Sequence, residues 1–225
     1  MAQSATPHPR SSTPPLTPLD QAPEVCNELS SMRDEPKHIW LLTGPAGCGK
    51  STLGKYLANV LGVPFIEGDE FHPKINVEKM SQGIPLTDAD RWDWLVSLRQ
   101  ASLDRLVAGH HGVVLTCSAL KRKYRDVIRV APYYFHKIRI HFFYLDAPES
   151  VLLARVKARK SHFMGANMVH SQFTILEPPD EDEKDVSRLD VGRPLEQVQE
   201  ELLSSVLNSN PYLVRKKKSN KPLGF

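Results

Sequence analysis

Cysteine is scarce in this chain, with only Cys26, Cys48 and Cys117 among 225 residues. Three cysteines cannot build a disulfide framework for a chain of this length, so a reducing compartment, the cytoplasm, is expected. Long apolar runs are also missing, and the longest stretches, such as residues 112–117 and 140–145, are no longer than a strand. This excludes a transmembrane helix, and no membrane partner is predicted.

The first 36 residues lack a periodic apolar pattern and hold 7 of the 18 prolines. Such a composition predicts a disordered extension over 1–36. It provides neither the apolar core of a secretory signal nor the arginine-rich, acid-poor composition of a mitochondrial presequence. Its net charge is −3, and that of the basic tail, residues 211–225, is +5. Because the whole chain carries +3, the net charge of the middle is about +1. A nucleic-acid partner is therefore not predicted, although the tail could be an import or polyanion-binding signal instead of a solvated end.

Between these tails, segments typical of strands alternate with segments typical of helices. The expected strands are 37–43, 63–67, 112–117, 138–146 and 186–191. The expected helices are 52–61, 87–107, 118–130, about 149–159 and 194–208, with an irregular stretch before the fifth strand. This order predicts an α/β domain over 37–210, with a parallel five-stranded sheet covered by helices on both faces and ligands at the carboxyl ends of the strands.

A glycine-rich loop separates the first strand from the first helix and has the pattern G-x-x-x-x-G-K-[ST]. Its glycines allow successive backbone N–H groups to turn toward phosphate oxygens, and the helix N-terminus adds positive potential. Lys50 is expected to contact the β- and γ-phosphates of ATP, and Ser51 to bind Mg²⁺. The predicted ATP-binding residues of this loop are Gly44, Ala46, Gly47, Cys48, Gly49, Lys50, Ser51 and Thr52. A glycine turn that merely caps a helix is the alternative.

The third strand ends in Leu115-Thr116-Cys117-Ser118, without the Asp that holds Mg²⁺ in many P-loop enzymes. A carboxylate instead follows the second strand, at Asp69. The doubly wound topology would bring Asp69 beside the phosphates, where it could accept a proton from an attacking hydroxyl or hold Mg²⁺ through water. The alternative is a turn aspartate that caps the next helix.

Three further stretches carry a recognisable pattern: Gly68-Asp69-Glu70-Phe71-His72-Pro73 with its continuation to Trp92, residues 117–126, and residues 155–179. With the phosphate loop, they resemble the P-loop gluconate kinase (gluconokinase) family, which is related to the shikimate and nucleoside monophosphate kinases. The resemblance covers roughly residues 38–208. It implies a three-layer P-loop kinase fold with a small helical lid at about 159–180. It also implies ATP-dependent phosphorylation of D-gluconate at the 6-hydroxyl, giving 6-phospho-D-gluconate for the pentose phosphate pathway.

Gluconate is a polyol with one carboxylate, so its site needs cations and hydroxyl-bonding groups. The residues expected to bind gluconate are Asp69, His72, Lys79, Arg91, Ser118, Lys121 and Arg125. Arg91 and Arg125 suit a bidentate clasp on a carboxylate, whereas a lysine is a less directional charge. Each of these side chains could instead be a solvated helix residue.

The predicted lid and the last strand add three arginines. Arg155 and Arg159 are spaced i, i+4 and share one helix face. Beside a P-loop, such cations stabilise charge on the transferring phosphoryl group, so both join Lys50 and Asp69 as predicted catalytic residues, with a solvated face as the alternative. Arg155 is also expected to bind ATP, as is Arg193, which could stack on the adenine or only begin a helix.

Two other functions remain open. A kinase for another small acid such as shikimate shares the phosphate loop, but shikimate kinases carry a glycine run where this chain has Cys117-Ser118-Ala119. A nucleotide-dependent switch or ATPase would not need a set of acceptor-binding charges. The predicted partners are ATP, Mg²⁺ and D-gluconate, and the sequence does not decide whether the protein forms a homodimer.

Overall fold

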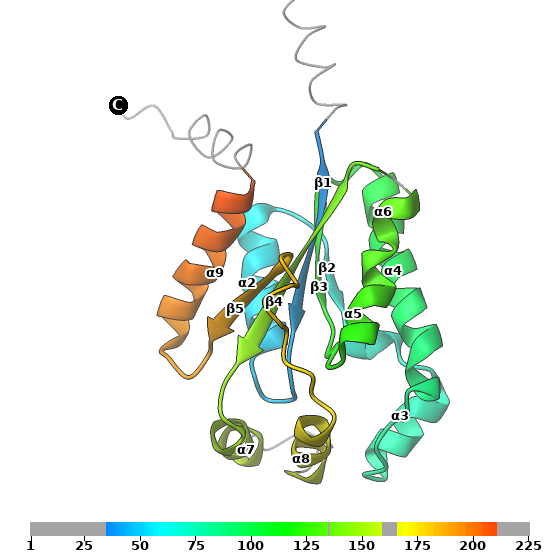
Figure 1. Ribbon diagram of the computed structural model, residues 1–225, viewed down its shortest axis with the longest axis vertical. Coiled ribbons are helices and arrows are strands. Elements are labelled where there is room, and N and C mark those ends of the chain that lie inside the picture. Colours follow the sequence, from blue (N-terminus) through cyan, green and yellow to red (C-terminus); the bar gives the residue numbers. More distant parts are fainter. Residues whose placement is uncertain (1–34, 135, 159–165, 211–225) are drawn as a thin grey trace, which may run out of the picture. The chain divides into compact units, whose positions relative to one another are not determined.

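The computed structural model describes residues 35–134, 136–158 and 166–210 (Figure 1). Every described helix and strand belongs to one unit that begins at Pro36. The predicted extension up to residue 34, the basic tail 211–225 and Arg159 lie outside the described residues. Within those residues, none of the helices combines the length and the apolarity needed to cross a membrane.

The centre of the domain is a five-stranded sheet in which every pairing is parallel. Its strands are β1 (Lys37–Thr43), β2 (Phe65–Glu67), β3 (Gly112–Thr116), β4 (Ile138–Asp146) and β5 (Val186–Asp190). Their order across the sheet is β2-β3-β1-β4-β5. All five predicted strands are confirmed, with ends that differ by two residues or fewer. Because the strands are parallel, the loops after β1, β2 and β3 meet at one edge of the sheet.

Helices cover both faces of the sheet, which confirms the predicted three-layer α/β fold (Figure 1). On one face lie α2 (Lys50–Leu61) and α9 (Leu195–Ser209), and on the other lie α4 (Trp92–Val107), α5 (Arg122–Arg129) and α6 (Ala131–Tyr134).

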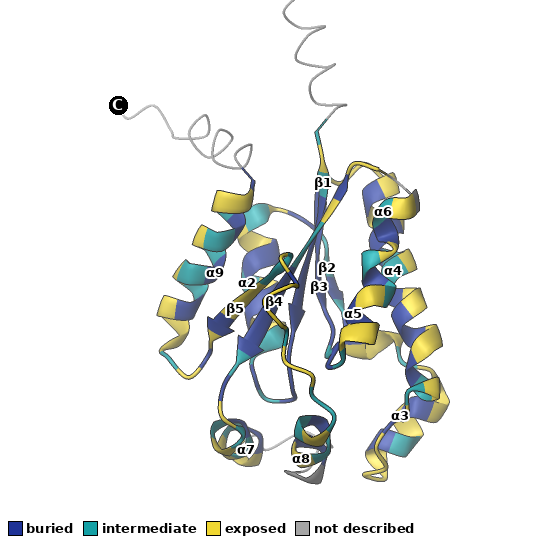
Figure 2. Ribbon diagram, in the orientation of Figure 1, coloured by how far each residue is buried: buried dark blue, intermediate teal, exposed yellow. Residues whose placement is uncertain are grey.

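The central strand β1 explains why both faces are covered. Trp40 and Leu42 pack into the cluster on the α2 side, whereas Ile39 and Leu41 pack into the cluster on the α4 side. All four side chains are fully buried, so β1 is apolar on both faces, as parallel strands usually are. Figure 2 shows this burial along the inner strands.

Three helical segments differ from the expectation. The helix predicted from residue 87 begins as a 3-10 turn (Ala89–Arg91), and α4 proper starts at Trp92. The helix predicted from residue 118 begins only at Arg122, because Ala119 has a positive φ of 28°, which a right-handed helix cannot contain. The stretch that shows no periodic pattern contains α8 (Ala166–Thr174), which lies within the segment where the resemblance implies a helical lid.

Two helices lie beyond the carboxyl ends of the strands (Figure 1). They are α7 (Glu149–Ala158), which was predicted, and α8, and the two are in contact. A further unpredicted helix, α3 (Lys74–Ser81), follows the 3-10 turn Gly68–Phe71 that comes after β2. These elements surround the edge of the sheet where the phosphate loop lies.

Candidate active site

A cavity of about 530 Å³ opens at the carboxyl ends of the strands. It collects residues from the phosphate loop, the segment after β2, the loop after β3, and helices α7 and α8. The lining residues are Ala46, Gly47, Gly49, Lys50, Ser51, Thr52, Lys55, Glu67, Asp69, His72, Met80, Leu86, Arg91, Ser118, Val156, Met168 and Gln172.

The phosphate loop forms the floor of the site between β1 and α2. Gly44, Gly47 and Gly49 all have positive φ, at 139°, 85° and 98°. A side chain at Gly47 would also collide with α7, since its Cβ would lie 2.9 Å from Val156 Cγ2. Helix α2 begins at Lys50 without a side-chain cap, so its first N–H groups are free to bind an anion. The expected strand–loop–helix arrangement is therefore present.

The Lys50 side chain folds back over its own loop. Its Nζ donates hydrogen bonds to the carbonyl oxygens of Gly44 at 2.9 Å and Pro45 at 3.0 Å. This holds the ammonium group against the first residues of the loop. In P-loop enzymes the corresponding lysine reaches the β- and γ-phosphates.

Asp69 lies in the 3-10 turn after β2, on a backbone fixed from two sides. Gly68 packs so tightly on β3 that a Cβ would lie 2.0 Å from the carbonyl oxygen of Thr116, which no other residue could satisfy. The indole Nε1 of Trp94 donates to the Gly68 carbonyl oxygen at 2.7 Å. The Asp69 carboxylate accepts no hydrogen bond from the described residues and faces the cavity. It is thus available to accept a proton or to bind a cation.

His72, which is half-buried, and Arg91, which is buried, both have unused hydrogen-bonding capacity. The His72 ring stacks on Trp94 with the centroids 4.1 Å apart, and no described residue bonds its buried Nδ1. Burial, aided by the charge of Arg91, lowers the pKa of His72 to about 4, so its ring is neutral at physiological pH. The Arg91 guanidinium is 5% exposed and its Nε lacks a partner among the described residues. A buried, incompletely bonded cation on a cavity wall favours an anionic ligand.

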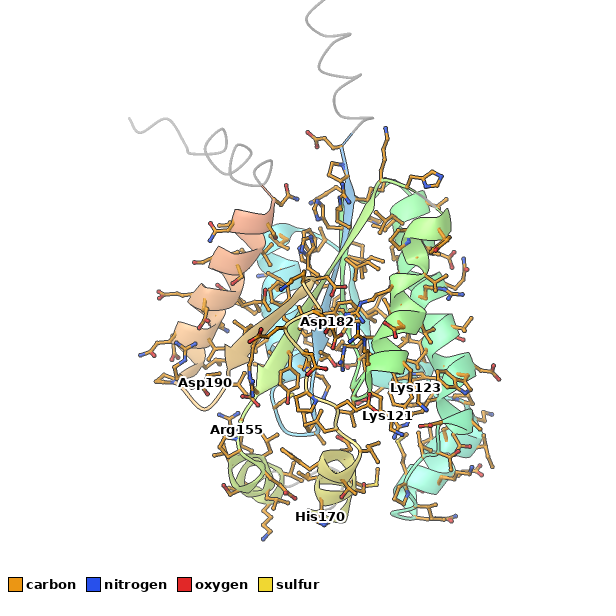
Figure 3. All side chains as sticks on the ribbon, in the orientation of Figure 1. Lys121, Lys123, Arg155, His170, Asp182 and Asp190 are labelled. Atoms are coloured by element: carbon orange, nitrogen blue, oxygen red, sulfur yellow. The ribbon has the colours of Figure 1, made fainter. Side chains whose placement is uncertain are left out.

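Two lysines predicted to bind gluconate do not line the cavity and are paired with aspartates instead. Lys79 Nζ lies 2.6 Å from Asp90 Oδ1, and Lys121 Nζ lies 2.9 Å from Asp88 Oδ1. Asp88 also accepts hydrogen bonds from Lys123 and from the Tyr124 hydroxyl, and this donor set lowers the pKa of its carboxyl far below the usual range. Figure 3 labels Lys121 and Lys123 at the start of α5. The geometry gives neither Lys79 nor Lys121 a place against an acceptor.

Arg125, which was predicted to bind gluconate, is buried and lies away from the cavity lining. It is 1% exposed, and its Nε and Nη2 donate to the Glu183 carboxylate at 2.7 and 2.5 Å. Its Nη1 donates to the carbonyl oxygens of Ala119 and Glu177. Burial alone would raise the pKa of Glu183, but the hydrogen bonds from Arg125 and Arg129 lower it to about 2. Arg125 fastens the segment after α8 to α5, and it does not line the cavity.

The predicted ATP-binding arginines that the structure describes also have other partners. Arg155 Nη2 donates to the Val191 carbonyl oxygen at 2.6 Å, and Arg193 is paired with Glu201. Figure 3 shows Arg155 near Asp190, the last residue of β5. Neither arginine lines the cavity in this conformation, and neither does Cys48, which is buried beneath the loop.

The cavity also includes residues for which the sequence analysis predicted no role. Glu67 ends β2, and its Oε1 accepts a hydrogen bond from the Thr116 hydroxyl at 2.5 Å. Met80, Leu86 and Met168 form a small buried apolar cluster in one wall. Gln172 reaches the phosphate loop from α8. Glu67 could have been found by its position at a strand end near Asp69. Met80 and Gln172 lie in stretches that carry the family resemblance, but no role in the site was predicted for either.

Comparison with known proteins adds an independent line of evidence. A family model described as an AAA domain matches residues 39–173. The probable gluconokinase of Schizosaccharomyces pombe is 48% identical over 173 residues, which is 76% of this chain and 88% of that protein. The thermosensitive gluconokinase of Escherichia coli is 39% identical over 168 residues, covering 75% of this chain and 87% of that protein.

Solved structures agree with these relatives. A gluconokinase from Sinorhizobium meliloti has a TM-score of 0.67 at 38% identity, covering 80% of this chain and 97% of that one. A sugar kinase from Janibacter has a TM-score of 0.69 at 39% identity, covering 79% and 98%. Both likenesses extend over nearly the whole of the other chain.

Proposed function

The chain belongs to the gluconokinase family, and from this premise we propose that it transfers the γ-phosphoryl group of ATP to the 6-hydroxyl of D-gluconate. The products are ADP and 6-phospho-D-gluconate, which supplies the pentose phosphate pathway. The observation that carries the proposal is the buried, incompletely bonded Arg91 in the same cavity as the phosphate loop. It supports an acceptor that carries a carboxylate.

The phosphate side of the reaction uses the loop and Lys50. The free N–H groups at the start of α2 and the Lys50 ammonium bind the β- and γ-phosphates. The 6-hydroxyl oxygen attacks phosphorus, the bond from phosphorus to the bridging oxygen breaks, and ADP leaves with that electron pair. Asp69 accepts the proton that the hydroxyl loses, since its carboxylate has no described hydrogen-bond donor to compete for it.

Mg²⁺ fits the oxygen donors that face this cavity. The Ser51 hydroxyl and the Asp69 and Glu67 carboxylates are ligand types that Mg²⁺ prefers. The described residues contain no cluster of three His, Cys, Asp or Glu side chains suited to hold a metal ion alone. This agrees with an ion that takes part of its ligands from phosphate and water, with Ser51 as a direct ligand and Asp69 acting through water. Bound there, Mg²⁺ would neutralise phosphate charge.

The acceptor side uses Arg91, His72 and Ser118. The Arg91 guanidinium offers the gluconate carboxylate two parallel N–H donors, a geometry that a lysine cannot reproduce. Because His72 is neutral, it exchanges hydrogen bonds with hydroxyl groups without adding charge.

We place the reaction in the cytoplasm, because Cys48 and Cys117 are both unpaired.

A test begins with ADP release from the full-length chain with gluconate, shikimate, glucose or no acceptor. The proposal requires gluconate to be the best acceptor. Glucose should be poor, because it presents a primary hydroxyl but no carboxylate. A higher rate with shikimate would favour the other acid kinase, and ADP release that is independent of any acceptor would favour the ATPase. Either result would overturn the proposal.

Variants at Arg91 then test how the carboxylate is bound. Arg91→Gln should lower kcat/KM for gluconate by about 10- to 150-fold, the equivalent of 1.5–3 kcal/mol for a charge-assisted hydrogen bond. Arg91→Lys should recover only part of this loss. The KM for ATP should stay within about twofold in both. Arg105→Gln is the matched control, because Arg105 is exposed near the end of α4 and does not line the cavity.

A further inference from the structure

Gln172 reaches the active-site cavity from α8, which lies within the predicted lid segment. Its side chain is 8% exposed and lines the cavity that contains the phosphate loop. Its neighbours Met168 and Val169, at 3% and 0% exposure, bury the inner face of α8, and Val169 shares a core cluster with Ala46 of the loop. The position of Gln172 is therefore fixed by packing.

The orientation of the Gln172 carboxamide follows from its single hydrogen bond. The backbone N–H of Ala46 donates to Gln172 Oε1 at 2.7 Å. The two ends of a glutamine amide are often hard to distinguish, but a backbone N–H can only donate, so the atom that faces Ala46 is the oxygen. The Nε2 group is therefore the end of the amide that does not face the Ala46 N–H. No described residue accepts a hydrogen bond from Nε2, and this atom is not one of the buried side-chain atoms without a partner, so it remains accessible from the cavity.

The terminal phosphates belong next to this free donor. Lys50 Nζ bonds to the carbonyl oxygens of Gly44 and Pro45, the two residues directly before Ala46. Since the lysine of a P-loop contacts the β- and γ-phosphates, Gln172 stands at the γ-phosphate end of the loop.

We propose that the Gln172 amide donates a hydrogen bond to the γ-phosphoryl group of ATP and is a further catalytic residue of this site. The proposal rests on the phosphotransferase function proposed above. The bond would form from a neutral donor to an anionic oxygen and would be held in place by Ala46 before ATP arrives. Because charge is spread over the γ-phosphoryl oxygens during transfer, a preorganised donor there stabilises the transition state. In this conformation Arg155, on α7, donates to the Val191 carbonyl oxygen instead of facing the cavity. Gln172, on α8, would then supply a polar contact from these two helices to the reacting group.

The competing view is that Gln172 only supports the loop through Ala46. Two substitutions separate these roles because they predict opposite orders of activity. Gln172→Glu keeps an acceptor for the Ala46 N–H but replaces the NH₂ donor with a negatively charged oxygen. Gln172→Met keeps the length of the side chain and removes both functions. If Gln172 only supports the loop, Gln172→Glu should be the more active of the two.

The proposal predicts the reverse order. In kcat/KM with ATP and gluconate, Gln172→Met should lose about 10- to 150-fold, the equivalent of one charge-assisted hydrogen bond. Gln172→Glu should lose more than Gln172→Met, because its carboxylate faces the phosphate. Ser171→Ala is the matched control on the same helix, since the Ser171 hydroxyl donates to the Met168 carbonyl oxygen and does not line the cavity. Its activity should stay within about twofold of the parent chain.

A binding measurement makes the test independent of the acceptor. Titration calorimetry with Mg²⁺ and either ADP or the β,γ-imido analogue of ATP separates contacts with the γ-phosphate from contacts with the rest of the nucleotide. Gln172→Met should bind the ATP analogue at least about 10-fold more weakly and ADP within about twofold of the parent chain. Equal losses for both nucleotides, or no loss for either, would overturn the proposal.

Failure of the proposed function would look different. In that case the parent chain would not phosphorylate gluconate, yet the difference between ADP and the ATP analogue would still report on Gln172. Thermal melting of each variant checks folding. If Gln172→Glu does not fold, the comparison of the two nucleotides with Gln172→Met decides the question alone.

Discussion

The buried ion pair between Arg125 and Glu183 allows a test of whether Arg125 stabilises the fold or binds gluconate. The two side chains are 2% and 1% exposed, and the carboxylate accepts two hydrogen bonds from Arg125 and one from Arg129. Glu183→Gln would leave the Arg125 guanidinium charged and buried without a carboxylate. Breaking such a pair costs about 3–5 kcal/mol, a large share of the 5–15 kcal/mol that stabilises a typical domain.

For a domain of this size, each kcal/mol lowers the melting temperature by about 2–4 °C, so Glu183→Gln should melt roughly 6–20 °C below the parent chain. A matched control lies close by, three residues before Arg125 and one residue before Glu183. The pair between Arg122 and Asp182 has a similar N–O distance of 2.7 Å, but its side chains are 47% and 59% exposed (Asp182 is labelled in Figure 3). Arg122→Gln should melt close to the parent temperature, because solvent screens that pair.

Urea unfolding gives the free energies, and gluconate kinetics at a temperature where every variant is folded give the functional comparison. We expect Arg125→Met to lose stability as Glu183→Gln does, while its KM for gluconate stays within about threefold. An Arg125→Met variant with parental stability and a large rise in the KM for gluconate would refute this reasoning. It would restore the carboxylate clasp that the sequence predicted.

Three further predictions concern catalysis, pH and the tails. Lys50→Ala should lower ADP release at least about 1000-fold with little change in melting temperature, because its Nζ bonds only within its own loop; near-parental turnover would contradict the phosphate-loop assignment. Burial and nearby basic side chains lower the pKa of His38 to about 4, below its unfolded value of 6.5, so the unfolded state takes up the proton first. Stability should therefore fall by up to about 3 kcal/mol as pH drops from 6.5 to 4, and urea midpoints should show a smaller drop for His38→Phe. A chain of residues 37–210 should keep kcat/KM within about threefold, and a larger loss would assign a role to a tail.

Much of the fold was predictable because it depends on local patterns. The strand β1 is apolar on both faces, which only a sheet covered by two helix layers can bury. Helix α8 was expected only through the family resemblance, which implies a helical lid. Its Gln172 accepts a hydrogen bond from Ala46, 126 residues earlier, and its Met168 packs with Met80 and Leu86, so the local pattern does not reveal these partners.

The site shows the same division. Asp69, His72 and Ser118 follow strands whose carboxyl ends must meet, whereas Arg91 lies in a stretch that carries the family resemblance. The structure places all four on the cavity. Their roles in binding and catalysis remain predictions. For the other cations, the sequence gives the number of charges but not their partners. The carboxylates that bind Lys79, Lys121 and Arg125 lie 11, 33 and 58 residues away along the chain.

These distant pairings determine how many cations an acceptor meets. Asp88 binds the ammonium groups of Lys121 and Lys123. Arg91, by contrast, lines the cavity and has no carboxylate partner among the described residues. Lys50 and Lys55 also line the cavity, but they belong to α2, directly after the phosphate loop. With Arg91 as the cation that meets the acceptor, the site suits an acid with one carboxylate and disfavours a sugar diacid, whose second charge would lose hydration without gaining a partner.

Asp88→Asn tests this explanation of selectivity. The amide oxygen can still accept the hydrogen bond from the Tyr124 hydroxyl, but the two lysines lose their counter-charge. We expect the KM for gluconate to change little and the inhibition constant of glucarate, a six-carbon diacid, to fall several-fold relative to it. Asp126→Asn is the control, since Asp126 is an exposed partner of Arg129 on α5. If glucarate binds the Asp88→Asn variant no better than it binds the parent chain, the pairing at Asp88 does not set the charge of the acceptor site.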